Sequence, residues 1–259
     1  MLAAWPKLPS TSSPTMNDPA SSGRPARQGK RRLGLYPSVL TESMKQASYQ
    51  LAVADGHPDL RTVQLDIIDG YFADNVTLTP ADFSDCSFGH LTADIHLMVE
   101  EPLDYLGECV VNRTALPIRT VLGQIEKMSS IDDFIEAVSQ QGWGAGLSLD
   151  LYTPLEEVSD DQLRELTALQ LMGIEAGFQG QTLHPGVVYK IEQLAGRCRD
   201  CGHRLEIIID GGVKLDNVEQ LIDNGVHGVV VGSEIWQANQ PDQVIDAYLR
   251  LELSDRPLI

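Results

Sequence analysis

Short aliphatic runs alternate with helix-like segments from Leu33 to the end of the chain. Eight runs are present, at residues 33–37, 62–68, 93–99, 119–125, 144–149, 168–174, 205–209 and 228–231. Most lack polar–apolar alternation, which indicates strands covered on both faces, as in a parallel sheet. The pattern predicts an α/β fold, a (β/α)8 TIM barrel. An open doubly wound sheet would carry a glycine fingerprint after its first strand, and none follows residues 33–37.

Helical segments separate these runs. We expect them at residues 41–54, 80–83, 102–110, 131–140, from 153 onward, 161–166, 185–199, 216–225 and 242–251. Pro154 suits the first turn of a helix. Asp216 and Glu219 have the spacing of a capping box, and Gly225 is a typical helix end.

The first 32 residues differ in composition from the rest. They are rich in Ser, Pro, Arg and Ala and have no apolar period, so we predict a disordered tail at 1–32 and a single barrel domain at 33–259. The acid-poor tail has some features of a transit peptide but no convincing amphipathic helix, and Met16 is an alternative start. We therefore expect a cytoplasmic protein.

Charge excludes several functions. The formal net charge is -18, although residues 1–32 are basic, so the predicted barrel is strongly acidic. Such a body argues against nucleic-acid binding, and no apolar run is long enough for a membrane span. An anionic substrate would have to be held by glycine loops and helix N-termini. Cys198 and Cys201 form a Cys-x-x-Cys pair, but no second pair has zinc-ligand spacing, so we interpret them as reduced thiols.

The run at 62–68 carries an unusual carboxylate. Gln64, Asp66 and Ile68 share one face of this strand, because side chains alternate. A buried carboxylate is costly unless it is paired, hydrogen-bonded or bound to metal. Asp69, before Gly70, is better explained as a turn residue.

Other polar residues follow the strands where a barrel places its active site. His96 and Met98 lie two apart, Gln124 and Glu126 lie at the end of the fourth run, Ser38 follows the first and Asp210 the seventh. Singly, His96 could be a core histidine and Glu126 a solvated loop residue. Together, Asp66, His96 and Asp210 indicate chemistry, because two facing carboxylates can act as base and acid.

Glycines follow the last three predicted strands. Gly211 and Gly212 come after residues 205–209, and Gly232 precedes Ser233 after residues 228–231. Backbone N–H groups at these places commonly form the phosphate site of such barrels. The loop at 177–180 could close over the same anion.

These residues resemble the ribulose-phosphate 3-epimerase family. The matching stretches are YPSVL (36–40), LDIIDG (65–70), DNVT (74–77), DIHLMV with EP (94–102), TPLE (153–156), GFQGQ (177–181), IDGGV (209–213) and VGS (231–233). They run in order over nearly the whole barrel. The resemblance implies a barrel of the ribulose-phosphate-binding type and interconversion of ribulose 5-phosphate and xylulose 5-phosphate.

The resemblance also implies roles for individual residues. Asp66 and Asp210 would exchange protons with the C3 carbon of the sugar and, with His96 and in part Gln64, hold one divalent metal ion, whether zinc, iron, manganese or magnesium. The substrate, a small sugar phosphate, would contact these residues: Ser38, Met98, Gly177, Phe178, Gln179, Gly180, Gly211, Gly212, Gly232 and Ser233. The resemblance leaves open whether the chain forms a homo-oligomer.

Four positions depart from the family pattern. The family's histidine two residues before the aspartate is Gln64 here, and its methionine two residues after the aspartate is Ile68. Its histidine on the fourth strand is Gln124, and its Asn-Pro before the glycine loop is Glu175-Ala176. Glutamine is a poor neutral ligand beside imidazole. The alternative function is therefore a phosphosugar-binding barrel with lost or changed activity. A related decarboxylase or synthase is disfavoured, since no lysine lies between Asp66 and Asp69.

Overall fold

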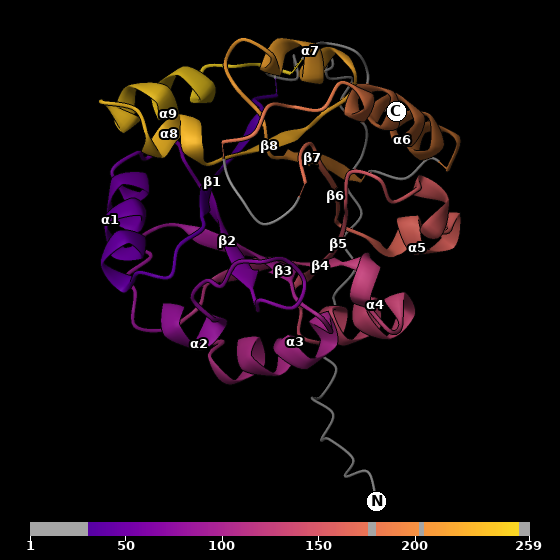
Figure 1. The fold of residues 1–259 in the computed structure, drawn as a ribbon, viewed down its shortest axis with the longest axis horizontal. Coiled ribbons are helices and arrows are strands. Elements are labelled where there is room, and N and C mark those ends of the chain that lie inside the picture. Colours follow the sequence, from indigo (N-terminus) through magenta and orange to yellow (C-terminus); the bar gives the residue numbers. More distant parts are fainter. Residues whose placement is uncertain (1–30, 176–179, 202–204, 254–259) are drawn as a thin grey trace, which may run out of the picture.

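A computed structural model describes residues 31–175, 180–201 and 205–253 of the chain. Eight parallel strands close into a barrel with helices around it, which confirms the predicted (β/α)8 architecture (Figure 1). The strands are β1 (Gly34–Val39), β2 (Thr62–Ile68), β3 (Thr92–Met98), β4 (Ile118–Gln124), β5 (Gly144–Leu149), β6 (Ala168–Met172), β7 (Glu206–Asp210) and β8 (Gly228–Val231). Each strand pairs with the next, and β8 pairs with β1. Residues 1–30 of the tail predicted at 1–32 lie outside the described residues, so the disorder of the tail stays a prediction.

Helices connect the strands. They are α1 (Met44–Asp55), α2 (Pro80–Phe83), α3 (Pro102–Val111), α4 (Ile131–Gln140), α5 (Asp160–Glu165), α6 (Gly186–Cys201), α7 (Val218–Asp223), α8 (Ser233–Trp236) and α9 (Pro241–Leu249), with 3-10 turns η1 (Ile125–Lys127) and η2 (Leu155–Glu157). Within the described ranges, no helix has both the length and the hydropathy needed to cross a membrane. Cys198 of the Cys-x-x-Cys pair lies on α6, where it is partly buried against the main apolar core.

Local hydrogen bonding explains where the predicted helices were wrong. The first helix begins at Met44 and not at residue 41, because Ser43 is the N-cap and its side chain accepts from the Gln46 N–H. The capping box predicted for Asp216 does not form. Asn217 takes the N-cap position, and its side chain instead accepts from the Lys214 N–H. The helix expected from residue 153 is reduced to the single turn η2.

The strands separate two cores. On β2, Val63, Leu65 and Ile67 point outward and belong to the main apolar core between the sheet and the helices. A smaller apolar cluster inside the barrel consists of Tyr36, Leu122, Ala168, Ile208 and Val230. Four of these five residues lie two positions before a polar residue on the same strand face, namely Ser38, Gln124, Gln170 and Asp210. The barrel interior therefore has a polar layer at the carboxyl ends of the strands and an apolar layer directly below it.

An ion-pair network lies toward the amino ends of the strands. Arg119 of β4 donates from Nε to Asp94 Oδ1 at 2.8 Å and from an Nη atom to Glu206 Oε2 at 3.3 Å. Its guanidinium carbon lies 4.8 Å from the ring centroid of Tyr36, whose hydroxyl donates to Glu206. The Asp94 side chain is only 1% exposed, so Arg119 compensates a carboxylate that water barely reaches.

Arg119→Leu is expected to lower the free energy of unfolding by about 3–5 kcal/mol, because it leaves the Asp94 carboxylate buried without its partner. Urea denaturation followed by circular dichroism measures this loss. The double variant Arg119→Leu/Asp94→Leu should regain most of it. Equal losses in the single and double variants would show that Asp94 does not depend on Arg119.

Candidate active site

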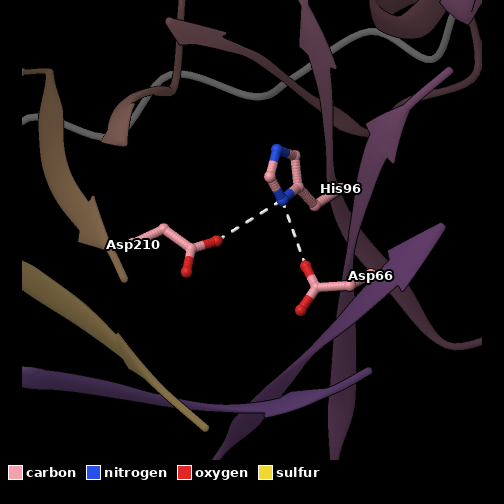
Figure 2. A group of neighbouring side chains, drawn as sticks. All are labelled: Asp66, His96 and Asp210. Atoms are coloured by element: carbon pink, nitrogen blue, oxygen red, sulfur yellow. Dashed lines mark hydrogen bonds and ion pairs between the residues drawn. The ribbon is translucent and has the colours of Figure 1, made fainter. Parts of the chain in front are cut away.

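Asp66, His96 and Asp210 meet at the carboxyl end of the barrel. Asp66 and His96 are register partners on β2 and β3, and Asp210 is the last residue of β7. His96 Nδ1 lies 3.1 Å from Asp66 Oδ1 and 3.4 Å from Asp210 Oδ2 (Figure 2). One imidazole nitrogen therefore faces two carboxylates that come from opposite sides of the barrel wall, as the positions of β2 and β7 in Figure 1 show.

The three side chains are withdrawn from water. The His96 side chain is 0% exposed, that of Asp66 is 3% exposed and that of Asp210 is 13% exposed. Burial alone would lower the pKa of His96, but its hydrogen bonds to Asp210 and Asp66 and their charges raise that pKa to about 9. Burial also raises the pKa of Asp210, against the lowering effect of His96. The imidazole therefore carries a positive charge at neutral pH and compensates the carboxylates.

The Gln64 amide adds neutral donors to the same carboxylates. Its Nε2 donates to Asp66 Oδ1 at 2.9 Å and to Asp210 Oδ2 at 2.6 Å. Ser38 Oγ donates to the other oxygen of Asp66 at 2.5 Å. Gln64 and Ser38 are register partners on β2 and β1, so the sheet pairing itself brings both donors to Asp66.

Gln170 also belongs to this site, although sequence reasoning did not single it out. It is fully buried on β6, and its Nε2 donates to Asp210 Oδ2 at 3.0 Å and lies 3.2 Å from His96 Nδ1. Its Oε1 is buried without a hydrogen-bond partner. The signal was present in the sequence, because Gln170 is the one polar residue in the aliphatic run at 168–172.

Gln124 orients the other nitrogen of His96. In the amide orientation that satisfies its neighbours, Gln124 Oε1 accepts from His96 Nε2 at 3.2 Å and from Ser148 Oγ at 3.2 Å. Its Nε2 then donates to Ser148 O at 3.0 Å and to Glu126 Oε2 at 2.8 Å. Glu126 in turn accepts from the Asp150 N–H at 2.7 Å. Glu126 is therefore part of a chain of hydrogen bonds to His96 and not a free loop residue.

The segment after β2 fixes the position of Asp66. Thr77 Oγ1 donates to Asp66 O at 2.6 Å and accepts from the Ile68 N–H at 2.9 Å. Asp69 accepts from the Tyr71 N–H at 2.8 Å and, through its other oxygen, from the Glu100 N–H at 2.7 Å. Asp69 is thus a turn residue, as its place before Gly70 predicted.

A cleft opens above the buried carboxylates. It is lined by Ser38, Leu40, Asp66, Met98, Met172, Ile174, Gly180, Asp210, Gly211, Gly212, Val213, Val230, Gly232 and Ser233. The structure therefore brings most of the predicted substrate residues together. Gly177, Phe178 and Gln179 lie outside the described residues. His96 and Gln64 do not line the cleft but contact Asp66 and Asp210, which do.

The glycines after β7 are required by geometry. Gly211 and Gly212 have φ values of 94° and 72°, which favour glycine. A Cβ on Gly211 would lie 2.2 Å from Ile174, and one on Gly212 would lie 2.4 Å from the Leu183 backbone nitrogen. The loop after β7 thus packs directly on the residues that follow β6.

Two carboxylates and one imidazole form a group that could hold a metal ion. One ligand atom each from Asp66, His96 and Asp210 lies within 4.8 Å of the others. Such a donor set suits a divalent transition metal, so these three residues fit the group. Gln64 presents its amide nitrogen here and would have to turn its oxygen inward to become a fourth ligand. Glu175, the extra carboxylate, is exposed and is not part of this group.

The fold and the site define a (β/α)8 barrel with paired carboxylates at its mouth. The family model for the ribulose-phosphate 3 epimerase family matches residues 34–236, and the chain belongs to that family of carbohydrate epimerases.

Curated relatives have matching names. Ribulose-phosphate 3-epimerase of Escherichia coli is 30% identical over 224 residues, which cover 85% of this chain and 96% of the relative. Ribulose-phosphate 3-epimerase 2 of Cupriavidus necator is 30% identical over 219 residues, covering 82% and 88%.

Solved structures confirm the barrel at low identity. Mycobacterium tuberculosis tryptophan synthase has a TM-score of 0.61 and 12% identity, covering 85% of this chain and 93% of that chain. A 3-hexulose-6-phosphate synthase has a TM-score of 0.53 and 12% identity, covering 84% and 97%. These likenesses concern the fold alone.

The buried charges predict that substitutions at His96 and Asp210 have very different effects on stability. His96→Leu is expected to lower the free energy of unfolding by about 3–5 kcal/mol, because it leaves two buried carboxylates without a cation. Asp210→Asn should change it by less than about 1 kcal/mol or raise it, because it removes one of the two like charges. Urea denaturation in the presence of EDTA compares the two variants. A larger loss for Asp210→Asn than for His96→Leu would contradict this account of the site.

Proposed function

We propose that the protein inverts C3 of a ketose phosphate of the ribulose 5-phosphate and xylulose 5-phosphate type. The observation that carries this proposal is the pairing of Asp66 and Asp210, two carboxylates from opposite sides of the barrel at one cleft floor. Inversion requires one group to remove a proton from one face of a carbon and another group to deliver a proton to the other face. The names of the curated relatives support the same reaction.

The proton transfers are assigned to the two aspartates. The C3 proton of such a sugar is adjacent to the C2 carbonyl, so its removal by one carboxylate produces an enediolate. The other aspartate, in its acid form, then protonates C3 from the opposite face, and the roles exchange in the reverse direction. The raised pKa of Asp210 suits a residue that carries a proton between these steps.

Neighbouring residues support the charge that develops on the substrate. The positive imidazole of His96 lies between the carboxylates and below the cleft, and Ser38 orients Asp66. A divalent ion held by Asp66, His96 and Asp210, whether zinc, iron, manganese or magnesium, would require His96 to lose a ring proton and would supply Lewis-acid stabilisation of the enediolate.

Backbone groups are the proposed phosphate site. Gly180, Gly211, Gly212, Gly232 and Ser233 line one part of the cleft. Exposed N–H groups at such turns bind anions without a cationic side chain, which suits a chain with a net charge of -18. Gly177, Phe178 and Gln179 are proposed for the same subsite from the family resemblance, and Ser38 and Met98 for contacts to the sugar.

A second candidate function is a phosphosugar-binding barrel without epimerase turnover. It is favoured by Gln64, whose amide nitrogen faces both carboxylates where the family has a histidine. It would keep the cleft and the glycine loops but lose proton transfer. The two functions differ in whether the C3 hydrogen of a bound substrate exchanges with solvent.

Purified protein incubated with ribulose 5-phosphate in D2O, with and without added divalent metals, is expected to incorporate deuterium at C3 and to form xylulose 5-phosphate. Proton NMR measures both products. Asp66→Asn and Asp210→Asn should each lower kcat by about 10²–10⁴-fold, because each removes a proton-transfer group. Asp85→Asn, which changes an exposed aspartate on the surface, is the matched control and should leave the rate unchanged.

Absence of exchange with pentulose and hexulose phosphates, with every metal supplied, would overturn the epimerase proposal. Saturable binding of the same sugar phosphates without exchange would then favour the second candidate.

A further inference from the structure

The Gln64 side chain occupies a central place between the two carboxylates. Its Nε2 donates one N–H to Asp66 Oδ1 and the other to Asp210 Oδ2, at 2.9 and 2.6 Å. These two oxygens are also the ones nearest to His96 Nδ1. A divalent ion ligated by Asp66, His96 and Asp210 would need the same inward-facing atoms.

The orientation of this amide follows from its surroundings. If Gln64 turned its Oε1 toward the two carboxylates, three oxygens with partial or full negative charge would face one another around the single Nδ1 proton of His96. The amide nitrogen instead supplies two protons to two carboxylate oxygens, and both are used. Gln64 is 1% exposed, so water cannot readily replace these hydrogen bonds.

Gln170 strengthens the same arrangement at a cost. Its Nε2 donates to Asp210 Oδ2 at 3.0 Å, while its own Oε1 remains buried without a partner. An unsatisfied buried acceptor is unfavourable, so the contact of the Gln170 amide nitrogen with Asp210 carries an energetic cost. Asp210 Oδ2 therefore accepts from two glutamine amides that approach from β2 and β6.

We propose that Gln64 and Gln170 are positioning residues that form an amide bridge, which assembles the Asp66–Asp210 pair without a divalent ion. A metal ion held by Asp66, His96 and Asp210 can bind only after Gln64 gives up its two hydrogen bonds, and Gln64 adds a fourth ligand only if it turns its oxygen inward. The chain is thereby a weak zinc binder whose carboxylates are already in place in the metal-free protein. The bridge lies in the site of the proposed epimerase. Its role in catalysis rests on that proposed function, whereas its effects on metal affinity and stability do not.

Because of the bridge, substitutions at position 64 have separate effects on metal affinity and on the stability of the metal-free protein. A histidine at position 64 would supply a nitrogen ligand in place of the amide donor, and zinc favours imidazole over an amide oxygen. A leucine at the same position would remove the donors and supply no ligand. In the metal-free state, either change leaves the two carboxylates with fewer hydrogen bonds.

The test uses the full chain as wild type, Gln64→His, Gln64→Leu and the control Gln50→Leu. Gln50 is a buried glutamine of α1 with an unpaired Oε1, so its variant reports the general effect of removing a buried amide. Zinc and manganese affinities are measured by titration calorimetry on metal-stripped protein. Thermal unfolding is followed in EDTA and in excess of each ion.

Gln64→His is expected to bind zinc at least about tenfold more tightly than wild type. In EDTA, Gln64→Leu should unfold about 2–8 °C lower than wild type. Wild-type Tm should be the same in EDTA as in metal-free buffer, and excess zinc should raise it less than it raises the Tm of Gln64→His. Gln50→Leu should keep the wild-type response to each metal.

Wild-type protein that binds one zinc ion as tightly as Gln64→His, or that unfolds at a lower temperature in EDTA than in metal-free buffer, would overturn the amide bridge. An unchanged Tm of Gln64→Leu in EDTA would overturn it as well, even if Gln64→His failed to fold. None of these measurements uses substrate. If C3 exchange is absent but the metal affinities and Tm values are as expected, the epimerase proposal is rejected and the bridge stands. If C3 exchange occurs but the metal affinities or Tm values differ from those expected, only the bridge is rejected.

Discussion

Two buried carboxylates that face a single imidazole determine how the carboxyl-terminal end of this barrel is built. Like charges in a region of low solvent access repel one another strongly, and without compensation they would destabilise the fold. His96 supplies one positive charge, and Gln64, Gln170 and Ser38 supply neutral donors. Gln124 then fixes the far side of the imidazole. The polar layer of the barrel is thus arranged around the requirement to keep Asp66 and Asp210 close together.

The layered interior explains how a chain can hold so many charges inside a barrel. An apolar cluster that includes Tyr36, Leu122 and Ile208 lies one layer below the polar residues of the cleft floor. Below it, Arg119 pairs with Asp94 and Glu206. Each charged group therefore has its compensating partner within its own layer. The strand period of two residues makes this arrangement follow directly from the order of residues along each strand.

Much of the fold followed from the sequence, because parallel strands buried on both faces give continuous aliphatic runs. The predicted bounds of β2, β5 and β8 agree with the observed strands. The carboxylate pair and His96 were also found, because charged residues in such runs are conspicuous. Gln170 was missed, because a single glutamine in an apolar run does not reveal which side chains of other strands it contacts. Its partners, Asp210 and His96, are known only from the closed barrel. The capping box at Asp216 was wrong because Asn217 competes for the same helix start, and only the folded loop decides between them.

The loop that follows β6 is fastened to the end of β7 at both of its ends. The Gly173 N–H donates to Asp210 O at 2.7 Å, and the His184 N–H donates to Gly173 O at 2.8 Å. Gly211 and Gly212 pack against Ile174 and Leu183, on either side of the intervening segment. These anchors hold the backbone at Asp210 in position. Substitution of the exposed Glu175, which lies just after the first anchor, is therefore expected to leave Asp210 in place.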